Sequence, residues 1–275
     1  MRTIRETIIA GKTILRSIRV SSGAHHGSRK PRHRITQEKV RKNNMRRAVR
    51  KLTALLNANF DETGAHVTLT YDGEAPDKKK AAADRRNFIR RLRYALEQCG
   101  QELKYVAVTE YENHRIHHHI VINSQDMTIL NECWKNGFVR TTALSDDGDY
   151  TKLAEYLIKE TEKTFRRSDS AHKQRYSASR TLIQPVPKRE EVNVRLLDDD
   201  PVPTKGYYIP KESVRRYEHP VTGIEYLEWI EIALSEETML KRKIWPRGTV
   251  SPWREAFRPD ELDIQEEFDW GGETW

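Results

Sequence analysis

Three consecutive histidines stand inside a β-rich run, RIHHHIVIN, which follows a second β-rich run, ELKYVAVTEYE. Only Asn113 and His114 separate the two runs, which is the spacing of an antiparallel β-hairpin. Successive side chains of a strand point to opposite faces, so His117 and His119 share one face and the isoleucines around them take the other. The hairpin therefore predicts an antiparallel sheet that buries its isoleucine face and presents two imidazoles on the opposite face.

The patterns on both sides of the hairpin define the rest of the fold. In chain order they are a strand in HVTLTYDG, a helix in APDKKKAAADRRNFIRRLRYALEQCG, the hairpin, a short helix in MTILNECW, a strand in GFVRTTAL and a helix in DYTKLAEYLIKETEKTF. Gly100 marks the end of the first helix. This order, βαββαβ followed by α, predicts an α+β fold with a ferredoxin-like split βαβ core. In that arrangement helices cover one face of the antiparallel sheet and leave the other face open for ligands.

An N-terminal segment, residues 1–60, precedes this core. It begins with two alternating runs around Gly11, which predict a β-hairpin, and continues at residues 21–34 with the composition of a linker. Thr36 is a suitable N-cap for the helix predicted in QEKVRKNNMRRAVRKLTALL, whose apolar residues recur at helical intervals between Arg and Lys. We therefore expect a hairpin, a linker and a basic amphipathic helix before a core at residues 61–184.

Residues 185–275 form a predicted C-terminal extension. The extension starts with a segment rich in Pro and charge, like a linker, and continues with YEHPVTGIEYLEWIEIAL, a predicted hairpin that turns at Thr222 and Gly223. Its five tryptophans are expected to make core or docking contacts. These patterns leave open whether the extension covers the sheet, binds DNA or pairs protomers.

Charge is spread unevenly along the chain. Residues 1–60 contain 16 Lys and Arg against two acids, a net charge of +14, whereas residues 255–275 contain one Arg against eight acids. A basic N-terminal segment favours a polyanionic partner, and an acidic tail favours a solvated or self-masking segment.

The cysteine count and the apolar runs indicate the compartment. Two cysteines, Cys99 and Cys133, are too few for a disulfide framework or a four-cysteine zinc site, which fits a reducing environment. No apolar run approaches the ~18 residues of a membrane span, and the first residues alternate charged with apolar side chains, unlike a signal peptide. We therefore expect a cytoplasmic protein without a membrane partner.

The shared strand face of His117 and His119 predicts a metal site. On the preceding strand Glu110 shares a face with Val106 and Val108, so the turn can bring its carboxylate beside the two imidazoles. Two histidines and one carboxylate suit Mn²⁺ or Mg²⁺ acting as a Lewis acid. Glu112 lies on the same strand face and is the alternative oxygen donor, and a further alternative is that the histidines contact phosphate without a metal. His118 points to the opposite face and is expected to be an interior residue.

Three stretches together resemble the HUH endonucleases, and in particular the replication initiators of rolling-circle plasmids and phages. HVTLTYDG is similar to the first motif of this superfamily, RIHHHIVIN to the metal-binding second, and LAEYLIKE to the third, in which a tyrosine is followed three residues later by a lysine. WKNGFV and RYSASRTL are also similar to segments of these initiators. His118 departs from the usual apolar middle position, and the third motif holds one tyrosine, as in the single-tyrosine members.

The resemblance implies a metal-dependent single-strand DNA nicking and joining enzyme. Tyr156 would be the nucleophile, Lys159 would favour its phenolate or steady the phosphate, and the product would be a 5′-phosphotyrosine and a free 3′-OH. The implied partners are single-stranded or hairpin DNA at a replication origin, with a host helicase and polymerase. We expect DNA contacts from basic residues of the first helix and from one beside the histidines: Arg46, Arg47, Arg50, Lys51 and Arg115.

Two alternatives remain open at this point. One is a single-tyrosine HUH transposase, although the long basic N-terminal segment and the C-terminal extension favour replication. The other is a non-catalytic nucleic-acid-binding module of the same fold, with Tyr105 or Tyr111 as stacking residues. Strand alternation places both tyrosines on the face opposite Glu110, which favours the metal site. Oligomeric state, host and origin sequence are left open.

Overall fold

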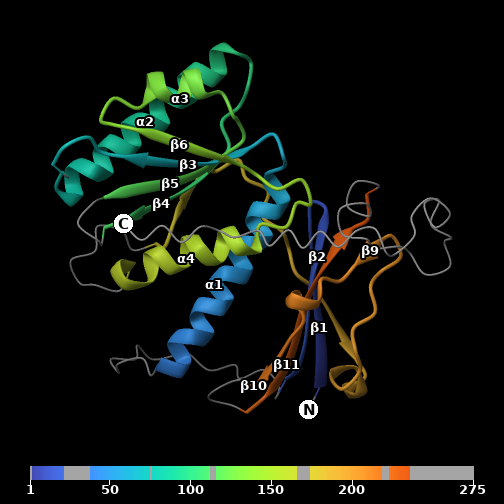
Figure 1. Ribbon diagram of the computed structural model, residues 1–275. Helices are drawn as coiled ribbons and strands as arrows, with labels where there is room; N and C mark the ends of the chain where they lie inside the picture. Colours follow the sequence, from blue (N-terminus) through green and yellow to red (C-terminus); the bar gives the residue numbers. More distant parts are fainter. Residues whose placement is uncertain are drawn as a thin grey trace, which may run out of the picture. The chain divides into compact units, whose positions relative to one another are not determined.

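The computed structural model of this 275-residue chain describes residues 2–21, 38–74, 76–111, 116–165, 174–218 and 223–235. The helices and strands in these ranges form two antiparallel sheets and four α-helices within one compact unit, Met1–Ala233 (Figure 1). The predictions for Thr36, for the linker after Ser21, for the acidic tail and for four of the five C-terminal tryptophans lie outside the described residues.

A five-stranded antiparallel sheet with the strand order β6-β3-β5-β4-β7 carries the predicted histidine hairpin (Figure 1). Its strands are β3 (Ala65–Thr70), β4 (Tyr105–Glu110), β5 (His117–Ile122), β6 (Val139–Ala143) and β7 (Ser177–Ala178). The four strands predicted from the sequence are confirmed, and β7 adds a short edge beside β4. The α+β class with an antiparallel sheet is therefore confirmed.

Helices α2 (Lys78–Gln98) and α3 (Met127–Cys133) pack on the isoleucine face of this sheet. Asp77 begins α2 because its side chain accepts the N–H of Lys80 at 2.8 Å. Gly100 ends α2, as predicted, because it adopts a positive φ of 71° that a glycine takes without a steric cost. The apolar residues of the two helices and of the strands between them form one buried cluster, which includes Leu69, Phe88, Leu92, Leu96, Ile120, Ile122 and Leu130.

Helices α1 (Glu38–Asn59) and α4 (Thr151–Phe165) pack on part of the opposite face, which the sequence had led us to expect open. Leu52, Leu56 and Leu157 are fully buried in the same cluster as Val106 and Val121. These valines stand near the start of β4 and the end of β5, whereas Glu110 and His117 stand at the other ends of the two strands. The polar end of the face is therefore the part at which a ligand can approach.

The second sheet combines segments from both ends of the described chain. Its order is β10-β11-β2-β1-β8, with β9 paired to β11. The strands are β1 (Arg2–Ala10), β2 (Thr13–Ser21), β8 (Lys188–Val192), β9 (Tyr207–Tyr208), β10 (Arg215–Glu218) and β11 (Glu225–Ala233), and two 3₁₀ turns lie at Val194–Leu197 and Lys211–Ser213. The two predicted hairpins are confirmed as β1–β2 and β10–β11. Trp229 is buried with Ile18 and Leu227, as expected for a core tryptophan.

The segment with linker composition after residue 185 supplies the edge strand β8. Pairs of charged side chains join β8 to β1, with Arg5 Nε 2.8 Å from Glu190 Oε1 and Arg189 Nε 2.8 Å from Glu6 Oε2. An edge strand exposed to water needs backbone pairing but no apolar alternation. The charged composition that resembled a linker is therefore compatible with a strand.

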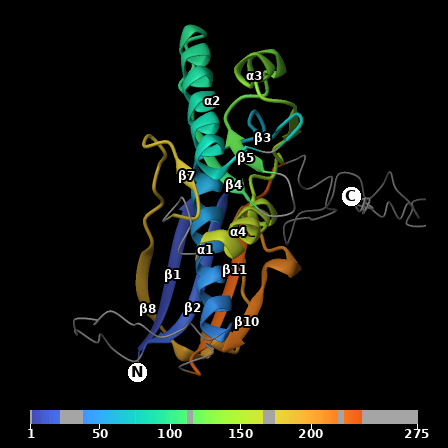
Figure 2. The same ribbon diagram turned by 90° about the vertical axis from the view of Figure 1, so that its left-hand side faces the viewer.

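Helix α1 contacts both sheets, and Figure 2 shows it running beside β1 and β2. Asn57 near its end donates to Thr13 Oγ1 at 2.8 Å and accepts from the backbone N–H of Tyr150 at 3.0 Å. A side chain at Gly11, in the β1–β2 turn, would collide with the Asn57 carbonyl. The two predicted extensions thus share one sheet, and α1 joins that sheet to the histidine-bearing one.

Two simpler predictions concern cysteine and membranes. Cys99 is exposed and Cys133 is buried, and both are free thiols. Among the described residues, no helix combines the length and the apolar composition needed to cross a membrane.

Candidate metal centre

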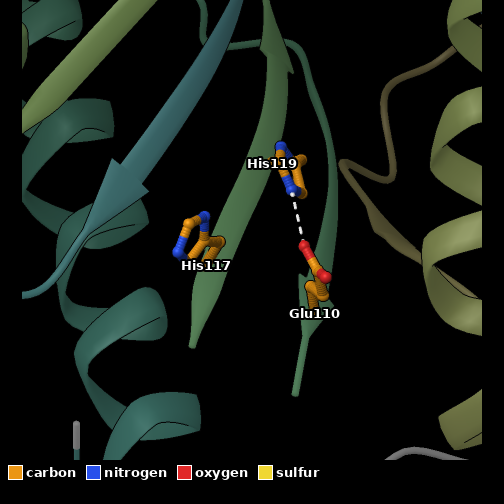
Figure 3. Close-up of side chains that lie close together, drawn as sticks. All are labelled: Glu110, His117 and His119. Carbon is orange, nitrogen blue, oxygen red and sulfur yellow. Dashed lines mark ion pairs between the residues drawn. The ribbon is translucent and has the colours of Figure 1, made fainter. Parts of the chain in front are cut away.

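The register of the β4–β5 pair brings the three predicted metal ligands together. Glu110 stands directly opposite His117, and Val108 stands opposite His119. One ligand atom from each of Glu110, His117 and His119 lies within 4.8 Å of the others, and Glu110 Oε2 is 3.6 Å from His119 Nε2 (Figure 3). Glu112 and Arg115 lie outside the described residues. The predicted ligand set is thus assembled in space, and metal binding itself stays a prediction.

The surroundings of His119 orient its ring. Only 3% of its side chain is exposed, and its Nδ1 lies 3.4 Å from Thr68 Oγ1 on β3, which leaves Nε2 directed at Glu110. The contact with His119 is the main cause that lowers the pKa of Glu110, and burial acts in the opposite direction. Two imidazole nitrogens and one ionised carboxylate are a suitable donor set for a divalent transition metal or Mg²⁺.

Tyr156 on α4 approaches the same imidazole. Its hydroxyl lies 3.3 Å from His119 Nε2, the two rings meet edge to face with centroids 5.2 Å apart, and 39% of the tyrosine is exposed. Burial, followed by the charges of Glu160 and Glu110, raises the pKa of Tyr156 to about 12. The phenol is therefore protonated at neutral pH, and a cation at the three ligands would offset the negative charge that disfavours its phenolate.

Lys159 and Glu160 follow Tyr156 on α4. Lys159 is exposed, and its charge opposes the larger effect of burial on the pKa of Glu160. Burial, and then Glu110 through its charge and a hydrogen bond, raises the pKa of Glu160. Our sequence reasoning missed Glu160. Its spacing of four residues from Tyr156, which places both on one helix face, was the available signal.

His66 on β3 is a second residue that sequence reasoning missed. Its ring stacks on His119, with centroids 5.4 Å apart and an interplanar angle of 28°, and meets Tyr156 edge-on at 6.0 Å. Burial, and then the charge of His119, lowers the pKa of His66 to about 4, so that the ring is neutral at pH 7. Because His66 pairs with Val121 and Thr68 with His119, strand alternation alone would have placed His66 on the metal face once the register was known.

His118 lies on the opposite face and is fully buried, as predicted. Its Nδ1 is 2.9 Å from Thr109 Oγ1, and its Nε2 is 3.0 Å from the Tyr71 hydroxyl. Arg85 donates to the same Thr109 oxygen at 2.8 Å. The middle histidine thus belongs to a buried polar network under α2, which satisfies its two ring nitrogens and supports β5 from behind.

The basic residues predicted to contact DNA lie on α1. Arg46, Arg47 and Lys51 are exposed and Arg50 is half-buried. The Arg46 guanidinium stacks on the ring of Tyr217 at 4.4 Å, so this side chain also joins α1 to β10. DNA contact by these residues remains a prediction.

Comparison with known families places this centre in a recognisable segment. Residues 64–165 match the family model of the replication-associated proteins known as ORF2 or gene 2 protein. The matched segment contains β3 to β6, α2 to α4, the three candidate ligands and Tyr156. No curated protein and no solved structure matches the chain. The match supports a replication-associated protein of the initiator type that binds DNA.

Proposed function

We propose that the chain is a rolling-circle replication initiator of the HUH endonuclease superfamily, which nicks and joins single-stranded DNA with a divalent metal ion. The observation that carries the proposal is the approach of the Tyr156 hydroxyl to within 3.3 Å of His119 Nε2, inside the cluster of Glu110, His117 and His119. A nucleophile beside a metal-ligand set, within the segment that matches replication-associated proteins, fits phosphoryl transfer better than simple binding.

When bound, Mn²⁺ or Mg²⁺ supplies a Lewis acid that polarises a phosphate oxygen. In the proposed nicking step the phenolic oxygen of Tyr156 bonds to phosphorus, and the bond between phosphorus and the 3′ oxygen breaks. The phenol loses its proton and the leaving 3′ oxygen gains one, which gives a 5′-phosphotyrosine and a free 3′-OH. Joining is the reverse attack of a 3′-OH on the phosphotyrosine.

The free 3′-OH explains the link to replication, because a polymerase can extend it. The DNA partner would be single-stranded or hairpin DNA at an origin, and a host helicase would supply the single strand. Lys159, three residues after Tyr156 on an exposed helix position, is proposed to steady the attacked phosphate. A single-tyrosine transposase would share this chemistry and would differ in its DNA substrates.

The non-catalytic alternative is less well supported. Tyr105 packs against the cluster under α2, and the Tyr111 hydroxyl is buried. Neither ring is therefore presented beside Glu110 for stacking with a base.

The test is covalent capture of DNA. Wild-type protein and Mn²⁺ are incubated with a panel of single-stranded oligonucleotides, and the adduct is detected by a mobility shift in denaturing gels. We expect an adduct whose nucleotide maps to Tyr156, and no adduct with Tyr156→Phe, which keeps the ring but removes the nucleophile. Tyr94→Phe is the matched control, because Tyr94 is a 66% exposed tyrosine on α2.

Two results would contradict the proposal in different ways. A nucleotide on Tyr150 or Tyr176 would keep the reaction class and move the nucleophile. Complete absence of adduct with wild-type protein across the panel, while DNA binding persists, would favour the non-catalytic module.

A further inference from the structure

A row of directly opposed residues runs across four strands from the metal centre to the sheet edge. Glu110 pairs with His117, and His117 pairs with Thr70. Thr70 and Phe138 then exchange both backbone hydrogen bonds, at 3.0 and 3.1 Å. Residues opposed in this way project from the same face of a sheet. Phe138 therefore lies on the metal face, two strands from His117, or about 10 Å at the usual strand spacing.

The ring of Phe138 is held in water by a rigid backbone. The residue is 67% exposed, although it is a large apolar side chain. Beyond its two bonds to Thr70, Asn136 accepts the N–H of Asp72 at 2.9 Å and Trp134 Nε1 donates to the Thr70 carbonyl at 2.9 Å. A side chain at Gly137 would collide with the Thr70 backbone, so the segment lies directly against β3. An exposed aromatic ring on such a fixed support is preorganised to stack.

A cation follows this ring on the same face. Arg140 is exposed, and it pairs with Thr68, which pairs with His119. Phe138 and Arg140 are two residues apart, so their side chains leave the edge of the sheet about 7 Å apart. Phe138 also lines an open pocket of about 660 Å³, together with Lys80 and Lys135.

We infer that Phe138 and Arg140 form a subsite for single-stranded DNA, in which a base stacks on the phenylalanine ring and a phosphate pairs with the guanidinium. Aromatic rings interleaved with cations are the usual means of holding single strands, and bases stacked inside a duplex offer no free face to such a ring. The inference rests on the proposed function, because the distance from His117 places the subsite within a few nucleotides of the attacked phosphate. It would orient the strand for Tyr156.

The first test is photocross-linking without metal, so that no cleavage is needed. The probe is oligo(dT) with single 5-iododeoxyuridine substitutions, and EDTA is present. Because Lys135 and Arg140 are trypsin sites, Phe138 lies in the short peptide Asn136–Arg140. We expect the cross-link in this peptide and its loss in Phe138→Ala.

The second test is affinity for the same oligo(dT), measured by fluorescence anisotropy. Phe138→Ala should weaken binding by about fivefold to a hundredfold, Phe138→Trp should retain it, and Arg140→Gln should lower the slope of log affinity against log salt by about one. Arg86→Gln, an exposed arginine on α2, is the matched control. An unchanged melting temperature in each variant shows that the fold is kept, as expected for exposed side chains.

The outcomes separate this inference from the proposed function. Cross-links confined to other peptides, or wild-type affinity in Phe138→Ala, would overturn the subsite, even if Tyr156 forms its adduct. An equal loss of affinity for duplex DNA in Phe138→Ala would overturn the single-strand assignment. A cross-link at Phe138 with no adduct at Tyr156 would support the subsite and contradict the proposed chemistry.

Discussion

His119 is the residue at which the proposed ligand set and nucleophile meet. Its Nε2 lies 3.6 Å from Glu110 Oε2 and 3.3 Å from the Tyr156 hydroxyl. A bound cation would use the lone pair of that nitrogen and an oxygen of Glu110. The same cation would neutralise charge that raises the pKa of Tyr156, so metal binding and nucleophile activation are coupled through these side chains.

Removing the carboxylate charge should weaken metal binding. We expect Glu110→Gln to lower Mn²⁺ affinity at least about tenfold, because the loss of an outer partner alone costs about 10–100-fold. Isothermal titration calorimetry measures the affinity, and Glu102→Gln is the control, since Glu102 is an exposed acid before the same strand. Affinity of the wild type should also fall between about pH 7.5 and about pH 5.5, because protons compete for the histidines.

Equal Mn²⁺ affinity in Glu110→Gln and Glu102→Gln would show that another oxygen donor completes the site. In that case Glu112, on the same strand face, becomes the residue to change. Affinity that does not respond to pH would argue against histidine ligands.

At this scale strand alternation was sufficient to group Glu110, His117 and His119, because all three stand on one hairpin with a short turn. The same reasoning placed His118 in the interior. His66 and Glu160 were missed since they reach the centre from β3 and α4, and neither the sheet register nor the docking of a helix follows from local periodicity. Nonlocal neighbours, rather than the ligands themselves, were the unpredictable part of the site.

Helix α1 has two different faces with different tasks. The apolar face, with Leu52 and Leu56, packs against the histidine-bearing sheet, as its periodicity predicted. The basic face carries Arg46, Arg47 and Lys51 in water. The sequence could not indicate that the helix also joins the second sheet, because that contact depends on single polar bonds such as that of Asn57 with Thr13.

The basic face of α1 should contribute to DNA binding through counterion release. We expect the triple change of Arg46, Arg47 and Lys51 to Gln to reduce the salt slope of single-strand binding by up to about two units, at ~0.7 per lost phosphate contact. Anisotropy titrations over a range of salt concentrations give the slope. The control removes three exposed arginines of α2, Arg86, Arg90 and Arg93.

The comparison between the two triples decides the interpretation. A larger loss for the α1 triple supports direct phosphate contact by this helix. Equal losses would mean that both helices act only through the general positive charge of the protein, and an unchanged slope would mean that the α1 charges are simply solvated.

On the scale of the whole molecule, the second sheet is built by pairing residues that are far apart in the sequence. Strand β2 lies between β1 and β11, and Arg16 of β2 meets Glu231 of β11 with Nε and Oε1 2.5 Å apart. Patterns predicted both hairpins separately, but nothing in either hairpin specified the other as its partner. Because pairing of open strand edges is decided by tertiary contacts, the combined sheet had to be observed.

The buried pair of Arg16 and Glu231 gives a test of this assembly. Only 1% of the Glu231 side chain is exposed, and its oxygens accept from the N–H of Thr204 at 2.9 Å and from Trp229 Nε1 at 3.0 Å. Burial raises the pKa of Glu231, but hydrogen bonds from Thr204 and Trp229 and the charge of Arg16 outweigh it, so that the pKa lies below its usual value. A lowered folded-state pKa means that the pair stabilises the fold above the unfolded-state pKa of 4.5 and loses this effect as pH falls through the folded-state value.

We therefore expect Arg16→Met to lower the free energy of unfolding at neutral pH by about 3–5 kcal/mol, because it leaves a buried carboxylate without its cation. The double variant Arg16→Met with Glu231→Leu should recover most of this loss, since neither charge is then buried alone. Urea denaturation, followed by tryptophan fluorescence, measures both values. The wild type should lose more stability on acidification than the double variant. If Arg16→Met alone unfolds like the wild type, the second sheet does not depend on this pair, and the contact between the two ends of the chain is carried by backbone pairing and apolar burial.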